Sequence, residues 1–179
     1  LSLLLLADCA LSVGGPQGTA KPKYYGTVAP YPNFNASHDA TVLHSAIEAK
    51  GVDEDVIISV LVMRSNEQRQ KIKAVYEATT GKRLDKDLKS ALRHDLEDVC
   101  LALLMTPAQF DAFCIRKATK GHGTCERSLI RVLVSRSELD LKKIVEEYYA
   151  MYNRHLQEDI VRDTKGHYQK VLLGLCGPI

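Results

Sequence analysis

Two stretches of this 179-residue chain repeat each other: GVDEDVIISVLVMRS at residues 51–65 and GTCERSLIRVLVSRS at residues 123–137. A shift of 72 positions aligns their glycine, their glutamate, the Val-Leu-Val segment and the final Arg-Ser. The correspondence continues without a gap, from Lys71 and Lys143 to Leu103 and Leu175. The chain is therefore predicted to contain two copies of one unit of about 70 residues.

Apolar residues in both copies recur at the spacing of an amphipathic helix, as in Val56, Ile57, Val60 and Leu61. Short helices of this kind are stable only when their apolar faces pack against each other. The pattern predicts an all-α fold with five helices in each copy. The expected helices are residues 38–49, 54–64, 67–80, 85–93 and 95–105, then 109–119, 126–136, 138–152, 156–162 and 166–176.

Residue types that begin or end helices separate these segments. Gly51 and Gly81 supply backbone freedom between helices, and Ser65 and Ser137 are predicted to cap the helices that follow them. Pro107 is predicted to close the first copy. The expected division is a tail at residues 1–37, one repeat at residues 38–107 and a second repeat at residues 108–179.

The segment before the first copy has a different composition. Residues 12–37 contain four prolines and four glycines, which predicts an extended and mobile tail. The chain begins with Leu1 rather than Met, and its first residues lack the basic segment of a secretory signal. No signal peptide is therefore expected.

The overall composition excludes several classes of protein. Apolar residues make up 45% and charged residues 26%, as in an ordinary globular protein. The formal net charge of +2 gives no reason to expect nucleic-acid binding. The five cysteines include no C-x-x-C pair, which favours a reducing compartment. No apolar run approaches the 18 or so residues that cross a bilayer, so a membrane role would be peripheral.

A glycine-containing loop carries the residues best suited to bind a ligand. It reads Thr119-Lys-Gly-His-Gly-Thr124, between two predicted helices. Glycines spaced in this way allow several main-chain oxygens to point toward one position. Calcium accepts six to eight oxygen ligands in irregular geometry, and a carboxylate must balance part of its charge. Asp163, 40 residues after Gly123, is the candidate carboxylate.

The loop, the acid 40 residues later and the gapless repeat resemble the annexin family, over about residues 38 to 177. The tail from Gly14 to Asn35 resembles that of the lipocortin branch. The resemblance implies a main calcium site made of the main-chain oxygens of Thr119, Gly121 and Gly123 and the Asp163 carboxylate. Lys120 would add attraction to a lipid headgroup. Cys125, where the family usually has aspartate, makes the loop less acidic and its calcium binding weaker.

The first copy departs from the main-site pattern, since Glu48 and Ala49 replace Lys120 and Gly121, and Ala91 replaces Asp163. The resemblance implies two lesser calcium sites instead. Their expected ligands are the carbonyls of Gly51 and Val52 with the Glu54 carboxylate, and the carbonyls of Lys89 and Leu92 with that of Glu97. The alternative is that Glu54 and Glu97 are solvated acids favoured by the helix dipole.

The resemblance also implies the function. Annexin cores contain four repeats, and these two are similar to the first and the fourth, which pack together in that family. The implied activity is calcium-dependent, reversible binding of anionic phospholipid of the phosphatidylserine type, with phospholipase inhibition by covering lipid substrate. The implied location is the cytoplasm, at the cytosolic face of plasma and vesicle membranes when calcium rises, with the nucleus as a further candidate. The tail is a candidate binding segment for a protein partner.

Other interpretations stay open or carry less support. A helical-repeat scaffold that binds proteins, with decayed calcium and lipid binding, is the main alternative. His122 and Cys125 lack the third group that orients a catalytic pair, so no enzyme activity is expected. Arg64 and Arg136, at matched positions, are predicted to be structural and to pair with an acid such as Asp87 or Asp159.

Overall fold

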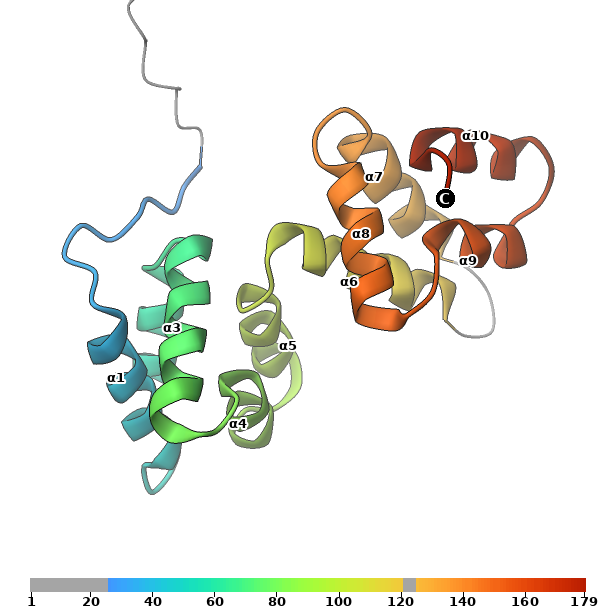
Figure 1. The fold of residues 1–179 in the computed structure, drawn as a ribbon. Coiled ribbons are helices and arrows are strands. Elements are labelled where there is room, and N and C mark those ends of the chain that lie inside the picture. Colours follow the sequence, from blue (N-terminus) through green and yellow to red (C-terminus); the bar gives the residue numbers. More distant parts are fainter. Residues whose placement is uncertain (1–25, 121–124) are drawn as a thin grey trace, which may run out of the picture.

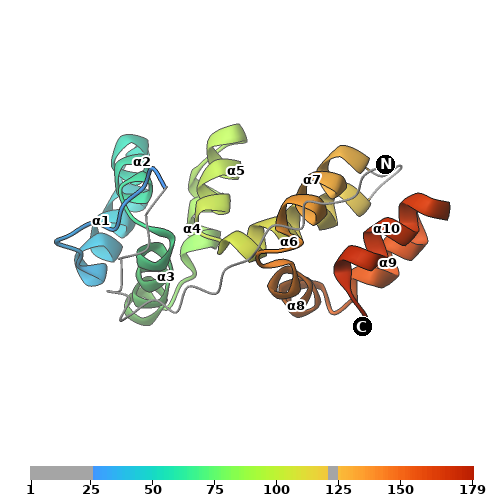
Figure 2. The same ribbon diagram turned by 90° about the horizontal axis from the view of Figure 1, so that it is seen from above.

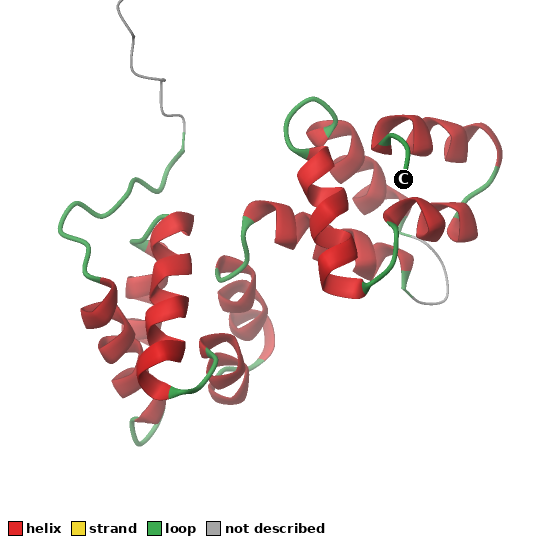
Figure 3. Ribbon diagram, viewed as in Figure 1, coloured by secondary structure: helices red, strands yellow, loops and turns green. Residues whose placement is uncertain are grey.

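The computed structural model describes residues 26–120 and 125–179, and within these ranges it contains ten α-helices and no strand (Figure 3). The all-α prediction is confirmed. The first five helices are α1 (Ala36–Glu48), α2 (Glu54–Val62), α3 (Asn66–Thr80), α4 (Leu84–Ala91) and α5 (His94–Leu103). The second five are α6 (Pro107–Thr119), α7 (Glu126–Arg136), α8 (Leu141–Tyr152), α9 (Leu156–Asp163) and α10 (Gly166–Cys176).

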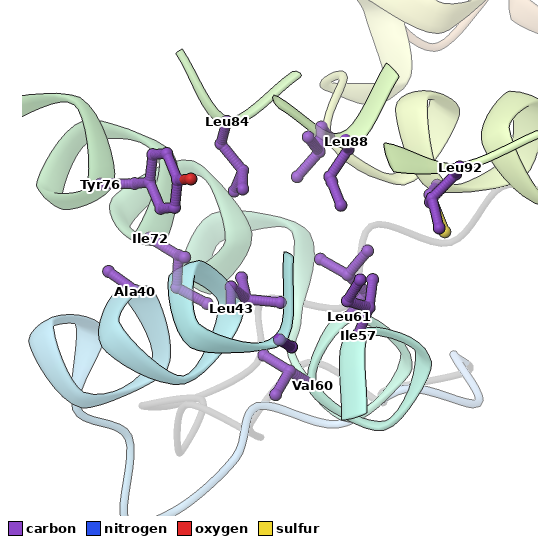
Figure 4. Close-up of a cluster of buried hydrophobic side chains, with 13 residues drawn as sticks. Ala40, Leu43, Ile57, Val60, Leu61, Ile72, Tyr76, Leu84, Leu88 and Leu92 are labelled. Carbon is purple, nitrogen blue, oxygen red and sulfur yellow. The ribbon is translucent and has the colours of Figure 1, made fainter. Parts of the chain in front are cut away.

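Each set of five helices encloses its own apolar core. Figure 4 shows the first core, where side chains from α1, α2, α3 and α4 point into a common interior. Tyr76 in this core and Tyr148 in the second core are both fully buried, at positions that the repeat aligns. Burial of each large apolar side chain contributes about 1.5–3 kcal/mol. The apolar residues that recur at helical spacing in the sequence therefore form two separate cores, one in each repeat.

The two repeats lie side by side and are joined through α5 and α6 (Figures 1 and 2). The helix pairs in most extensive contact, such as α1 with α3 and α6 with α8, all belong to one repeat. The two copies therefore meet at the α5–α6 junction rather than around a shared core.

Side chains of α3 hold this junction in place. Four of them donate hydrogen bonds to main-chain oxygens there: Asn66 to Met105 (2.7 Å), Arg69 to Leu103 (2.7 Å), and Gln70 and Lys73 to Leu104 (3.0 and 2.8 Å). Thr106 then caps α6, with Pro107 in its first turn, where the missing amide hydrogen costs no hydrogen bond. The connection between the repeats is consequently well defined.

The last part of the predicted tail is fixed to the first repeat. Residues 1–25 lie outside the described residues, whereas Tyr31 exchanges two main-chain hydrogen bonds of 2.9 Å with the side-chain amide of Gln68. The Arg64 guanidinium lies 3.9 Å from the centre of the Tyr31 ring, in a cation–π contact. The chain segment directly before α1 is thus held by α2 and α3.

The predicted cap at Ser137 is wrong, and α8 begins at Leu141 rather than residue 138. Ser65 caps α3 in a capping box with Gln68, as predicted. Ser137 has helical backbone angles and its hydroxyl donates to the Val134 carbonyl, so it extends the end of α7. The second copy has Asp140 where the first has Gln68, and the shorter side chain forms no such box.

No helix in the described part of the chain is both long enough and apolar enough to span a bilayer.

Candidate metal centre

A main-chain hydrogen bond joins the residues on either side of the loop that is predicted to hold the main calcium site. The Cys125 amide donates to the Ala118 carbonyl at 2.9 Å, and the matched bond in the first repeat joins Asp53 to Ala46 at 3.0 Å. Gly121 and Gly123 lie outside the described residues. The two repeats therefore close their α1–α2 and α6–α7 loops with the same hydrogen bond.

Thr119 and Lys120 form the carboxyl end of α6. The Thr119 side chain is buried and its hydroxyl donates to the Ile115 carbonyl at 3.1 Å, which leaves the main-chain oxygen as its candidate metal ligand. The last carbonyls of a helix lack intrahelical partners and carry the negative end of the helix dipole. This end of α6 is accordingly suited to a cation, and Lys120 beside it is exposed.

Asp163, the predicted acidic ligand, is the last residue of α9, a helix that packs against α6. Its carboxylate already has a cationic neighbour, because Arg162 Nε lies 2.9 Å from Asp163 Oδ1. The same guanidinium donates from Nη1 to Asp159 at 2.7 Å. A calcium ion at the main site would compete with Arg162 for this carboxylate.

Asp159 is the centre of a charged cluster that the sequence did not predict. Its carboxylate is fully buried, and it accepts from Arg116 (3.0 Å), Arg154 (2.6 Å) and Arg162 (2.7 Å) as well as from the Tyr148 hydroxyl. Burial would raise its pKa, but the hydrogen bonds and positive charges outweigh burial and hold the pKa of Asp159 below its ordinary value. Asp159 therefore fixes Arg162 next to Asp163.

The first predicted lesser site lies in the α1–α2 loop. Gly51 has a φ of 80°, and the loop lines an open hollow of about 380 Å³ together with Val52 and Glu54. Asp53 caps α2 by accepting from the Val56 amide at 3.1 Å, so its carboxylate is engaged. Glu54 is exposed and forms no ion pair with any described residue. Its carboxylate is thus open to a cation in the hollow.

The second predicted lesser site lies at the end of α4, and the second repeat has different side chains at the aligned positions. In the second repeat the Gln169 side-chain amide donates to the carbonyls of Val161 (3.1 Å) and Thr164 (2.6 Å). The shift of 72 aligns these residues with Glu97, Lys89 and Leu92.

Glu97 has no side-chain N–H to donate. It therefore cannot join the carbonyls of Lys89 and Leu92 in the way that Gln169 joins those of Val161 and Thr164. The Arg93 guanidinium donates instead to Leu92 at 2.7 Å. The first repeat thus has an acid where the second has an amide that donates to two carbonyls. A cation between the Glu97 carboxylate and these carbonyls can bind all three groups.

Cys125 and His122, the weakly supported catalytic pair, are not brought together by the described structure, since His122 lies outside it. The exposed Cys125 thiol lies 3.3 Å from the Ser128 hydroxyl, and this hydrogen bond lowers the pKa of the thiol. Among the residues that the structure describes, no three His, Cys, Asp or Glu side chains gather as a metal site.

Known proteins are similar to this chain in both sequence and structure. The annexin family model matches residues 38–103 and 110–175. Annexin A1 of Equus caballus is 51% identical over 165 residues, which are 92% of this chain and 45% of that protein. The solved structure of annexin III has a TM-score of 0.84 at 42% identity, over 86% of this chain and 48% of that one.

A solved structure of calcium-bound annexin (Sm)1 also matches, with a TM-score of 0.76 at 30% identity, over 86% of this chain and 46% of that one. This chain thus spans less than half the length of these relatives. The family model covers both sets of five helices, in the order that the repeat predicts. The chain belongs to the annexin family.

Proposed function

We propose that this chain binds anionic phospholipid membranes reversibly and in a calcium-dependent manner, without chemical turnover. The observation that carries the proposal is the carboxyl end of α6, where the Cys125 amide donates to the Ala118 carbonyl, beside a helix that ends in Asp163. The main-chain oxygens of Thr119, Gly121 and Gly123 and the Asp163 carboxylate would hold calcium. Bound calcium supplies positive charge that attracts a phosphate oxygen of the lipid.

The basic residues of the chain attract an anionic lipid less strongly than a bound calcium ion would. The formal net charge is +2, and Lys120 is the exposed base next to the loop. Because calcium and lipid would share one site, each must raise the affinity for the other by the same factor. Calcium binding is therefore expected to be weak alone and stronger when anionic membrane is present.

The first repeat is proposed to bind calcium at the two lesser sites. Glu54, which forms no ion pair with the described residues, lies beside the open hollow of the α1–α2 loop, and Glu97 stands where the second repeat has the amide of Gln169. Both donor sets combine main-chain oxygens with one carboxylate, which suits calcium. The proposal gives the second repeat the main role and the first repeat a supporting one.

Other consequences follow from a membrane-bound chain. Phospholipase inhibition would result from covering the lipid substrate and would need no separate inhibitory site. The chain would be cytoplasmic and would move to the cytosolic face of plasma and vesicle membranes when calcium rises. A protein partner is proposed for the tail.

Sedimentation with phosphatidylserine vesicles, in calcium or in a chelator, tests the proposal. The chain should sediment with vesicles in calcium and stay in solution with the chelator. Asp163→Ala should raise the calcium concentration needed for half-maximal binding by about tenfold, the effect of about 1.4 kcal/mol. Glu158→Ala is the matched control, because Glu158 is an exposed acid at the opposite end of α9.

Three results would contradict the proposal. Vesicle binding that is unaffected by the chelator would show that calcium is not required. Equal effects of Asp163→Ala and Glu158→Ala would show that Asp163 has no particular role. A folded chain with no vesicle binding in calcium would favour the protein-binding scaffold instead.

A further inference from the structure

A hollow of about 330 Å³ in the first repeat lies between α1 and the end of α3, two helices that pack side by side (Figure 1). The residues that line it are Ala40, Thr41, His44, Thr79, Thr80 and Lys82. The shift of 72 aligns the last five with larger side chains of the second repeat, namely Phe113, Arg116, Met151, Tyr152 and Arg154. The first repeat thus has open space at positions that carry bulky side chains in the second.

Two of these larger side chains bind a buried acid. Arg116 and Arg154, aligned with His44 and Lys82, donate to Asp159 at 3.0 and 2.6 Å. Both arginines begin at positions that line the hollow in the first repeat. A side chain of arginine length therefore reaches from the hollow to the acid at the aligned position.

Asp87, the acid aligned with Asp159, has no guanidinium partner among the described residues. It accepts from the Tyr76 hydroxyl at 2.7 Å. Lys82 pairs with Glu48 at 3.3 Å instead of reaching Asp87. Burial and the negative charges of Asp87 and Glu48 raise the pKa of Tyr76. The first repeat thus keeps the acid of this cluster, in an excess of negative charge and without the arginines.

The walls of the hollow offer a ligand mainly hydrogen-bond acceptors. The three threonine hydroxyls donate their hydrogens to main-chain carbonyls of their own helices: Thr41 to Ser37 (3.0 Å), Thr79 to Val75 (2.8 Å) and Thr80 to Tyr76 (2.6 Å). Their oxygens are left to accept. A guanidinium group, with five N–H donors and no acceptor, matches such walls, whereas a phosphate needs donors.

His44 adds one more acceptor. Its Nδ1 lies 3.3 Å from the Tyr76 hydroxyl, whose hydrogen is already donated to Asp87. Nδ1 must therefore be the donor in this contact, and Nε2 of the neutral ring is an acceptor. The hollow consequently combines acceptor atoms with a nearby acid that has no ion pair within the described ranges.

We propose that the first repeat binds an arginine side chain of a partner protein in this hollow, with the guanidinium on the Asp87 carboxylate. The bound group would take the place that Arg116 and Arg154 have around Asp159 in the second repeat. A hollow of about 330 Å³ is small for a ligand site and suits one long side chain. Neither calcium nor lipid takes part in this interaction.

NMR titration of the full chain in chelator tests the proposal, with the blocked tripeptide acetyl-Gly-Arg-Gly-amide as the probe. The His44 ring resonances should shift and saturate, with a dissociation constant on the order of 1 mM for a single side chain. The citrulline tripeptide has the same shape without the charge and should not bind. The lysine tripeptide should bind about threefold more weakly, because an ammonium group cannot bridge both carboxylate oxygens as a guanidinium does.

Two variants locate the site. Asp87→Asn should raise the dissociation constant about tenfold, since it removes the charge that the guanidinium binds. His44→Arg introduces the guanidinium that the second repeat has at Arg116, and it should abolish peptide binding while raising the melting temperature. Glu67→Gln is the matched control, because Glu67 is an exposed acid at the opposite end of α3, and it should leave the dissociation constant unchanged.

The NMR spectrum of each variant also shows that it is folded. The absence of saturable shifts with the arginine tripeptide would overturn the proposal. Equal binding of the arginine and citrulline tripeptides, or unchanged binding in His44→Arg, would overturn it as well. If inorganic phosphate shifts the same resonances and the arginine tripeptide does not, the hollow is an anion site instead.

Discussion

Arg162 and Asp163, neighbours at the end of α9, form an ion pair with 2.9 Å between Arg162 Nε and Asp163 Oδ1. The same guanidinium reaches Asp159, which also binds Arg154. Arg162 is thus shared between a structural acid and the proposed calcium ligand. The first repeat has Ser90 at the aligned position and no acid after it, so the competition exists only in the second repeat.

Replacing Arg162 should strengthen calcium-dependent membrane binding. Arg162→Gln removes the cation that competes for Asp163, and a partly exposed ion pair of this kind contributes up to about 1 kcal/mol. The calcium concentration for half-maximal vesicle binding should fall by about two- to fivefold. Arg154→Gln is the control, because it weakens the Asp159 cluster without touching Asp163, and it should leave that concentration unchanged. Equal shifts in both variants would contradict the assignment.

Exchanging the side chain at position 169 should create a calcium site. Gln169→Glu gives the second repeat the acid of the first and removes the hydrogen bonds to Val161 and Thr164, at a cost of about 1–3 kcal/mol without calcium. Calcium titration calorimetry should then detect one additional site, and calcium should restore the lost thermal stability. The reciprocal Glu97→Gln should remove one site from the first repeat. Unchanged numbers of sites in both variants would refute the second lesser site.

Removing the buried charge of Asp159 should destabilise the second repeat. Asp159→Asn leaves three arginines around a neutral group, and loss of a buried ionic partner costs about 3 kcal/mol. Asp87→Asn in the first repeat is the matched control, since Asp87 accepts from Tyr76 (2.7 Å) and forms no ion pair within the described residues. Its cost should be about 1 kcal/mol. Urea unfolding followed by circular dichroism measures both.

The stability difference between the original chain and Asp159→Asn should depend on pH. The folded-state pKa of Asp159 lies below the ordinary value of 3.8, so the charged form is favoured by folding. The difference should be fully present above about pH 5, and it should decrease as the pH falls below 3.8 toward the folded-state pKa. A difference that stays constant down to pH 2 would show that the charge of Asp159 is not responsible.

The sequence predicted the helices because apolar spacing reports directly which faces are buried. Tyr76 and Tyr148 coincide in the repeat, and both are fully buried, each donating to an acid, Asp87 or Asp159. The ends of helices were less predictable, because they depend on one or two side chains. Ser65 and Ser137 look equivalent in the sequence, and the residue three positions later decides which of them caps a helix.

The partners of the repeated arginines were predicted incorrectly. Arg64 pairs with Asp39 (2.6 Å) and Arg136 with Asp111 (2.8 Å), rather than with Asp87 or Asp159. Helical spacing gives the face on which a residue lies, but not which helix crosses that face. Asp39 and Asp111 coincide under the same shift of 72 that aligns the arginines. An acid that is repeated together with the arginine could therefore have indicated the correct pairs.

The predicted calcium ligands remain predictions for a related reason. Main-chain oxygens have no residue identity, so the sequence indicates them only through the glycines and the family pattern. The described structure adds what the pattern omits, namely the cations beside these oxygens and acids. Arg93 donates to the Leu92 carbonyl, and Arg162 pairs with the Asp163 carboxylate.

Ser65, at the α2–α3 junction, caps a helix and Ser137, at the α7–α8 junction, does not, and this difference leads to a further prediction. Ser65→Ala should destabilise the chain by about 1 kcal/mol, because it removes a capping bond to the Gln68 amide. Ser137→Ala should change stability by less than about 0.5 kcal/mol, since its hydroxyl caps no helix. Urea unfolding of the two variants measures this difference, and equal losses would contradict it.

The same comparison gives a stabilising substitution. Asp140 Oδ1 is buried without a hydrogen-bond partner among the described residues, at the position where the first repeat has Gln68. Asp140→Gln supplies the longer amide of a capping box, which forms once the Ser137 backbone changes from helical angles to the extended angles of Ser65, and it should then stabilise the chain by about 0.5–1.5 kcal/mol. Adding Ser137→Ala to Asp140→Gln should remove this gain, because the box needs both side chains. If the gain survives in the double variant, it arises from removing the buried carboxylate and not from a restored cap.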